Sequence, residues 1–149
     1  MSTDLPTTTA RTISISDKAI EAIRKHGAVE FPYECCGALV DVDGRIVEAV
    51  ALRNTTGGGA TRRFRIGPEG YREAEARARE SGGTLAGFYH SHPNEPARPS
   101  QYDLDHAWPN LTYIIISVNG GTPGDITAWH LRDDRSGFDE GELKWHTGY

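Results

Sequence analysis

Two histidines and an aspartate at a fixed spacing are the residues of this chain best suited to bind a metal ion. His90 and His92 are separated by one residue, and ten residues lie between His92 and Asp103. In an extended segment the side chains of residues i and i+2 point to the same face, so both imidazoles can reach one point. Two imidazoles and one carboxylate leave the fourth position of a tetrahedral zinc ion open to water. The pattern therefore predicts a metal-dependent hydrolase.

The aspartate also has a structural interpretation. Ser100 and Asp103 form a Ser-x-x-Asp pattern, which is typical of a capping box at a helix N-terminus. The two roles are compatible, because a carboxylate in the first helical turn is held stiffly. His106, one turn later, is an alternative third ligand, whereas Asp105 points elsewhere on the expected helix.

A metal-bound water needs a proton acceptor that is not itself a ligand. Glu34 is the candidate, although its position alone equally fits an exposed glutamate that precedes a strand. The adjacent Cys35 and Cys36 are expected to pack in the core rather than act as nucleophiles, because no histidine flanks them and Glu34 raises a thiol pKa. Two thiols that are badly placed to bond each other indicate a reducing compartment.

The hydrophobic pattern predicts a mixed α/β domain, with a central mixed β-sheet of six or seven strands flanked by about three helices. Ser16 is expected to cap a helix that runs to about His26 and stops at Gly27, and Asp43-Gly44 predicts a hairpin turn. His90 falls at the end of a predicted strand and His92 just beyond it. The expected strands cover 12–15, 36–40, 46–52, 63–66, 84–90, 111–118, 125–131 and 142–147, and two further helices cover 68–80 and the segment from 101 to before Pro109.

The whole chain is typical of one soluble domain. It has 149 residues, an apolar fraction of 37% and a formal net charge of −5, which argues against a nucleic-acid partner. Residues 1–10 are expected to be a disordered tail, without the features of a secretory signal, and residues 11–149 to form the domain. No apolar run approaches the roughly 20 residues that span a bilayer. The expected location is the cytoplasm, with no membrane partner.

Three segments together resemble the JAMM (MPN-plus, JAB1/MPN/Mov34) metalloprotease family over roughly residues 12–131. They are Glu34-Cys-Cys-Gly, His90-x-His92-Pro and Ser100-x-x-Asp103, and the family's His-x-His-x10-Asp spacing is met in full. The resemblance implies an MPN-like fold and zinc bound by His90, His92 and Asp103. It also implies that Glu34 is the general base and acid, and that Ser100 stabilises the oxyanion of the tetrahedral intermediate.

The family hydrolyses peptide or isopeptide bonds after the C-terminal Gly-Gly of ubiquitin-like proteins. The compact length resembles stand-alone prokaryotic members, some of which act on ubiquitin-like sulfur carriers or release cysteine from them. The resemblance therefore implies a β-grasp partner that ends in Gly-Gly. The loop 54–60 and the arginines at 62, 63 and 65 are the expected part of its docking surface, although such a basic cluster is also typical of a solvated strand edge. The substrate and its leaving group, whether lysine side chain, peptide or free cysteine, stay open.

Two alternatives belong to other functional classes. A non-catalytic module that binds a ubiquitin-like tail would not need Glu34, Ser100 and the three metal ligands, all of which are present. A non-haem iron enzyme also uses two histidines and one carboxylate, but requires an octahedral ion and a co-substrate.

Overall fold

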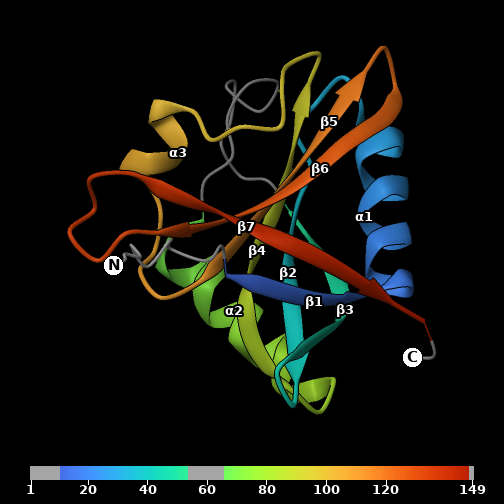
Figure 1. Cartoon of the computed structure of the whole chain (residues 1–149). Coiled ribbons are helices and arrows are strands. Elements are labelled where there is room, and N and C mark those ends of the chain that lie inside the picture. Colours follow the sequence, from blue (N-terminus) through green and yellow to red (C-terminus); the bar gives the residue numbers. More distant parts are fainter. Residues whose placement is uncertain (1–10, 54–65, 148–149) are drawn as a thin grey trace, which may run out of the picture.

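The computed structural model describes residues 11–53 and 66–147 (Figure 1). The expected tail at 1–10, the loop at 54–60 and the arginines at 62, 63 and 65 lie outside the described residues, as do three of the four positions of the expected strand at 63–66. The fourth, Ile66, is not in a strand. No helix in the described ranges is long and apolar enough to cross a membrane.

The described residues form a mixed α+β domain with seven strands and three helices, as the sequence predicted. The strands close into a barrel in the order β1-β3-β2-β4-β5-β6-β7, in which β1 pairs in parallel with both β3 and β7. In Figure 1, β7 runs beside β1, so the last strand completes the barrel at the first. The elements are β1 (Thr12–Ser16), α1 (Asp17–Glu30), β2 (Cys36–Val42), β3 (Arg45–Leu52), α2 (Pro68–Glu80), β4 (Thr84–Pro93), α3 (Gln101–Asp105), β5 (Thr112–Asn119), β6 (Thr122–Leu131) and β7 (Phe138–His146).

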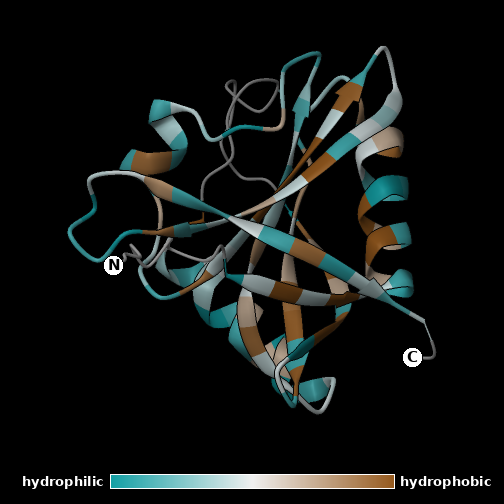
Figure 2. Ribbon diagram, viewed as in Figure 1, coloured by the Kyte–Doolittle hydropathy of each residue, from teal (hydrophilic) through white to brown (hydrophobic). Residues whose placement is uncertain are grey.

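Strand β5 forms the centre of the core because side chains on both of its faces are buried. Ile114, Ile116 and Val118 pack into one cluster with residues of α1, whereas Tyr113 and Ile115 pack into a second cluster with Phe88 and α2 residues. This arrangement explains the run of consecutive apolar residues at 113–116, which is typical of a strand covered on both sides. Figure 2 shows apolar residues along β5 and an alternation of apolar and hydrophilic residues along α1.

The first helix is longer than the sequence predicted. Ser16 caps it as expected, since its hydroxyl accepts a hydrogen bond from Ala19 N over 3.1 Å. The expected stop at Gly27 is wrong, because the helix continues to Glu30. Gly27 instead allows α1 to approach the sheet, since a Cβ built there would lie 3.0 Å from Cγ2 of Val118. The helix ends before Pro32, whose ring disfavours a helical conformation in the preceding residue.

Of the two segments that carry the site, the strand differs from its expected bounds and the short helix agrees with them. Strand β4 extends to Pro93 because its last residues pair with β5, so His92 lies within the strand rather than beyond it. Helix α3 ends at Asp105, before Pro109 as expected. The chain leaves the helix because Trp108 is bonded to other parts of the fold, through its backbone N–H to the Tyr113 hydroxyl and through Nε1 to Ile66 O.

Candidate metal centre

Strand β4 brings the two histidines together. It lies inside the barrel wall, antiparallel to β2 and parallel to β5. His90 and His92 point to the same face, and their Nε2 atoms are 3.2 Å apart. Both side chains are buried, so their positions are fixed by the wall around them.

Helix α3 supplies the carboxylate. The Ser100 hydroxyl accepts a hydrogen bond from Asp103 N over 3.1 Å, and Ser100 N donates to Oδ2 of Asp103 over 2.9 Å, so the predicted capping box is formed. The same Oδ2 lies 3.3 Å from Nε2 of His90 and 3.2 Å from Nε2 of His92. Asp103 therefore caps the helix and faces both imidazoles. In Figure 1, α3 and the end of β4 lie toward the same end of the molecule.

The alternative ligands are turned away from this cluster. Nδ1 of His106 is 2.9 Å from Tyr102 O, and its ring stacks on that of Tyr102. Asp105 accepts a hydrogen bond from the Gln101 side chain. Within the described ranges, the group formed by His90, His92 and Asp103 is the only one with three or more potential ligand atoms gathered for a metal ion.

The spacing of the three donor atoms suits a small tetrahedral ion. Donors about 2.0–2.2 Å from a tetrahedral zinc ion lie roughly 3.3–3.5 Å from one another, and the three distances here are 3.2, 3.2 and 3.3 Å. Burial would raise the pKa of Asp103, but its close contacts with His90 and His92 and the hydrogen bond from Ser100 N outweigh that effect and hold the pKa well below its usual range. An ionised carboxylate and two imidazoles are a donor set that zinc accepts.

Glu34 lies beside this cluster, although the sequence alone could not establish that. The backbone N–H of Ser91 donates to Cys35 O over 3.1 Å, and the Ser91 hydroxyl accepts from Cys35 N over 2.8 Å. These bonds continue the antiparallel register in which Cys36 faces His90, and so they place Glu34 next to His92.

The environment of Glu34 favours its protonated form. The side chain is buried, which contradicts the alternative of an exposed glutamate before a strand. Burial raises its pKa to about 8, with further increases from the Asp103 and Glu95 carboxylates and an opposing effect of His92. A carboxyl group that holds a proton near neutral pH beside a metal site is suited to general acid and base chemistry.

The two cysteines are core residues, as the sequence predicted. Both are buried and free. Burial raises the pKa of the Cys35 thiol to about 11 and that of Cys36 further still. A thiol that stays protonated at neutral pH is a poor nucleophile.

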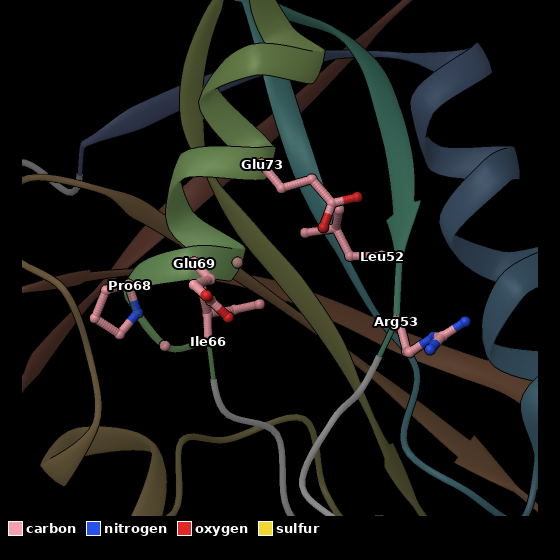
Figure 3. Close-up of a pocket in the computed structure, with 8 residues that line it drawn as sticks. Leu52, Arg53, Ile66, Pro68, Glu69 and Glu73 are labelled. Carbon is pink, nitrogen blue, oxygen red and sulfur yellow. The ribbon is translucent and has the colours of Figure 1, made fainter.

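One hollow borders the site, and a second lies farther away. A groove of about 310 Å³ lies beside Ser100 and is lined by Leu104, Trp129 and Phe138, with Arg98 and Gln101 at its edge. A larger cavity of about 620 Å³ lies between the end of β3 and the start of α2, where Leu52 and Glu73 point toward one another (Figure 3). Leu52 pairs with Cys36 and Cys36 with His90, so this cavity begins two strands away from His90.

Some residues around the site were not identified from the sequence. Ser91 fixes the backbone beside Glu34, and its place between the two histidines was the available signal. Ser117 and Thr127 bond the loop after β4. Nothing in the local sequence marks them, because their partners are backbone carbonyls 22 and 30 positions away.

Comparison with known proteins identifies the family. A family model described as prokaryotic homologs of the JAB domain matches residues 16–132. Tail tip assembly protein K of Escherichia phage N15 is 33% identical over 126 residues, which are 85% of this chain and 45% of the phage protein. The chain thus spans less than half the length of that relative. Desampylase of Haloferax volcanii is 31% identical over 106 residues, which are 70% of this chain and 76% of the enzyme.

Solved structures share the fold. The solution structure of a protein from Desulfitobacterium hafniense has a TM-score of 0.76 and 30% identity, and covers 91% of this chain and 94% of its own. A JAB1/MPN domain protein from Archaeoglobus fulgidus has a TM-score of 0.59 and 19% identity, with coverage of 89% and 98%, and shows likeness of fold alone. The resemblance that the Glu34, His-x-His and Ser-x-x-Asp segments predicted is confirmed, and the chain belongs to the prokaryotic JAB (JAMM/MPN) family.

Proposed function

We propose that this protein is a zinc-dependent peptidase or isopeptidase that cleaves the bond after the C-terminal Gly-Gly of a ubiquitin-like or sulfur-carrier protein. The observation that carries the proposal is the cluster of His90, His92 and Asp103 beside a buried carboxyl group, Glu34. A module that only bound such a protein would have no use for a buried proton carrier at a metal site.

The residues divide the chemistry between them. His90, His92 and Asp103 would hold zinc, which when bound polarises a carbonyl group and activates a water molecule. In its ionised form Glu34 accepts the proton of the attacking water, and it then returns that proton to the leaving amine. The Ser100 hydroxyl oxygen already accepts a hydrogen bond from Asp103 N, so its proton remains available to donate to the oxyanion.

The substrate class is supported by a relative. The archaeal relative carries an enzyme name, desampylase, which supports a ubiquitin-like protein as substrate. The Gly-Gly specificity is part of the proposal, since glycine has no side chain to collide with the walls beside the metal. The groove beside Ser100 has room for side chains, so we assign the leaving group to it.

The phage relative favours a second candidate with the same chemistry. Its match covers 85% of this chain, and its name refers to tail tip assembly. In this alternative the hydrolysed bond lies in a protein of a phage tail tip, without a requirement for Gly-Gly.

The first test compares zinc content and cleavage in the same preparations. Wild-type protein is expected to hold one zinc per chain and to cleave an extended β-grasp carrier after Gly-Gly, as seen by mass spectrometry. A chelator is expected to stop cleavage, and the double variant His90→Ala/His92→Ala is expected to lose both zinc and activity. Zinc retained by the double variant would contradict the ligand assignment.

Substrate variants then separate the two candidates. Carriers with either glycine changed to alanine are expected to resist cleavage, because the proposed Gly-Gly specificity leaves no room for an added methyl group. Equal cleavage of the alanine carriers would contradict the Gly-Gly specificity and favour the second candidate.

A further inference from the structure

Three consecutive carbonyl groups in the loop after β4 are each bound to a side chain. Glu95 O accepts a hydrogen bond from the Ser117 hydroxyl over 2.6 Å, and Ala97 O accepts one from the Thr127 hydroxyl over 2.6 Å. Between them, Pro96 O lies 2.8 Å from Nδ1 of His92. The two flanking bonds come from the barrel wall, and the middle one comes from a member of the candidate metal centre.

The flanking bonds fix the direction of the middle carbonyl. Each peptide group is planar, so the orientation of Pro96 O depends on the peptide groups before and after it. Glu95 and Pro96 are exposed and have no core packing to hold them in place. Pro96 O also accepts a hydrogen bond from Arg98 N over 2.9 Å, and the next residue, Ala97, is buried in the core. The two hydroxyl groups act together with these contacts to set the position of Pro96 O.

The wall that carries these hydroxyl groups is itself well anchored. Ser117 is buried on β5 and faces His92 in the parallel register of β4 and β5. The Thr127 hydroxyl on β6 also accepts a hydrogen bond from Nε1 of Trp129 over 2.8 Å, which aligns it as a donor to Ala97 O. Hydrogen bonds linked in this way reinforce one another.

The middle carbonyl decides which nitrogen of His92 faces the metal centre. A carbonyl oxygen only accepts, so Nδ1 of His92 must carry the proton that it donates to Pro96 O. In the neutral ring Nε2 then keeps its lone pair, and it is Nε2 that lies against Asp103 and His90. A metal ligand whose other ring nitrogen is held in this way has its tautomer and orientation fixed.

We propose that Ser117 and Thr127 are positioning residues for His92, because they hold the Pro96 carbonyl that selects the His92 tautomer and directs Nε2 to the metal. The inference rests on the proposed function in so far as the metal is zinc. The His92 tautomer itself does not depend on which reaction the protein catalyses.

The test uses Ser117→Ala, Thr127→Val and their combination. Thr112→Val is the matched control, since Thr112 is also on the barrel wall and its hydroxyl bonds the side chain of His130 rather than the loop. Zinc affinity is measured by competition with a chromophoric chelator, and the His92 tautomer by ¹⁵N NMR of the imidazole in chelator-treated protein. The combined variant is expected to bind zinc about 10- to 100-fold more weakly, the range for loss of groups that orient metal ligands, and to show a mixed His92 tautomer.

Control variants separate loss of the hydroxyl groups from other effects of substitution. Thr127→Ser keeps the hydroxyl group and is expected to retain wild-type affinity, as is Thr112→Val. Zinc affinity within twofold of wild type in the combined variant, with an unchanged His92 tautomer, would overturn the proposal. If wild-type protein binds no zinc, the proposed function fails, and the NMR comparison still decides whether the two hydroxyl groups set the tautomer. If the combined variant does not fold, the single variants carry the same comparison.

Discussion

At the scale of single residues, two neighbouring carboxyl groups are driven toward opposite protonation states. Burial raises the pKa of Glu34 to about 8, whereas the contacts of Asp103 with His90, His92 and Ser100 N overcome the burial of Asp103 and lower its pKa. One site thus contains an ionised carboxylate suited to bind a cation and a carboxyl group suited to carry a proton. Such a separation of pKa values is the pattern by which acid and base roles are divided in enzyme sites.

The replacement Glu34→Gln tests this division of roles. Glutamine has nearly the same shape but cannot accept the proton, so turnover is expected to fall by about 10²- to 10⁴-fold. Zinc content and thermal stability are expected to stay close to wild type, because Glu34 is not among the three clustered ligands. Both are measured beside the turnover of a Gly-Gly-linked substrate.

The matched control is Glu30→Gln, at the end of α1. It removes a nearby carboxylate that is not part of the site and is expected to leave turnover unchanged. Near-normal turnover by Glu34→Gln would assign the proton transfer to another group.

At the scale of elements, the close packing of α1 on β5 depends on Gly27. A Cβ at this position would lie 3.0 Å from Cγ2 of Val118 and 3.8 Å from Cβ of Ser91. Gly27→Ala gains up to about 1 kcal/mol in helix propensity, but overpacking typically costs about 1–3 kcal/mol. The variant is therefore expected to be less stable than wild type by about 1 kcal/mol, as measured by urea unfolding.

A second substitution in the same helix separates the two effects. Val29 is exposed, and Val29→Ala gains helix propensity without entering the core. It is expected to raise the free energy of unfolding by a few tenths of a kcal/mol. If Gly27→Ala raised the free energy of unfolding as much as Val29→Ala does, the prediction would be wrong. The helix could then move away from the sheet without loss of stability.

The sequence predicted elements whose boundaries depend on local signals. The cap at Ser16, both ends of α2 and the Asp43-Gly44 turn fall where expected, because each depends on the conformational preference of one or two residues. The boundaries that were wrong involve tertiary contacts. Pairing with β5 extends β4 to Pro93, and Gly27, expected to end α1, lies inside the helix and packs against Val118.

The same distinction applies to the candidate site. The spacing of His90, His92 and Asp103 in the sequence was enough to predict that they could meet, since a strand and a capped helix hold them. The burial of Glu34 beside His92 depends on the pairing of β2 with β4, which no local pattern encodes. For the same reason, Ser117 and Thr127 could not be predicted.

At the scale of the whole molecule, the closed barrel joins segments that are far apart in the chain. The pairing of β7 with β1 links residues 142–146 to residues 12–16. The site itself combines the start of β2, the end of β4 and α3. Each of these segments contributes different side chains. Unfolding of the barrel is therefore expected to abolish metal binding and proton transfer together, rather than one of them alone.

The stability of the barrel as a function of pH depends in part on His130, which lies on β6 between β5 and β7. Its Nε2 is 2.9 Å from the Thr112 hydroxyl, and it stands opposite Asp139 in the register of β6 and β7. Burial, with a smaller effect of Arg11, lowers the pKa of His130 to about 4. The fold therefore favours the neutral imidazole.

The direction of the pH effect follows from this lowered pKa. Above pH 6.5 the histidine is neutral in both the folded and the unfolded chain, and its contribution to stability is fully present. As the pH falls from 6.5 toward 4, the unfolded chain takes up a proton that the folded protein does not, so the free energy of unfolding decreases.

His130→Gln keeps a group that can bond the Thr112 hydroxyl but does not titrate. Wild type is expected to lose more stability than this variant between about pH 7.5 and about pH 5, because only wild type has this difference in proton uptake. Urea unfolding at both pH values, with a chelator present so that metal release does not contribute, measures the two losses. Equal losses of stability in the two proteins would contradict this prediction. They would mean that His130 has the same pKa in the folded barrel as in the unfolded chain, so that a charged imidazole is tolerated between β5 and β7.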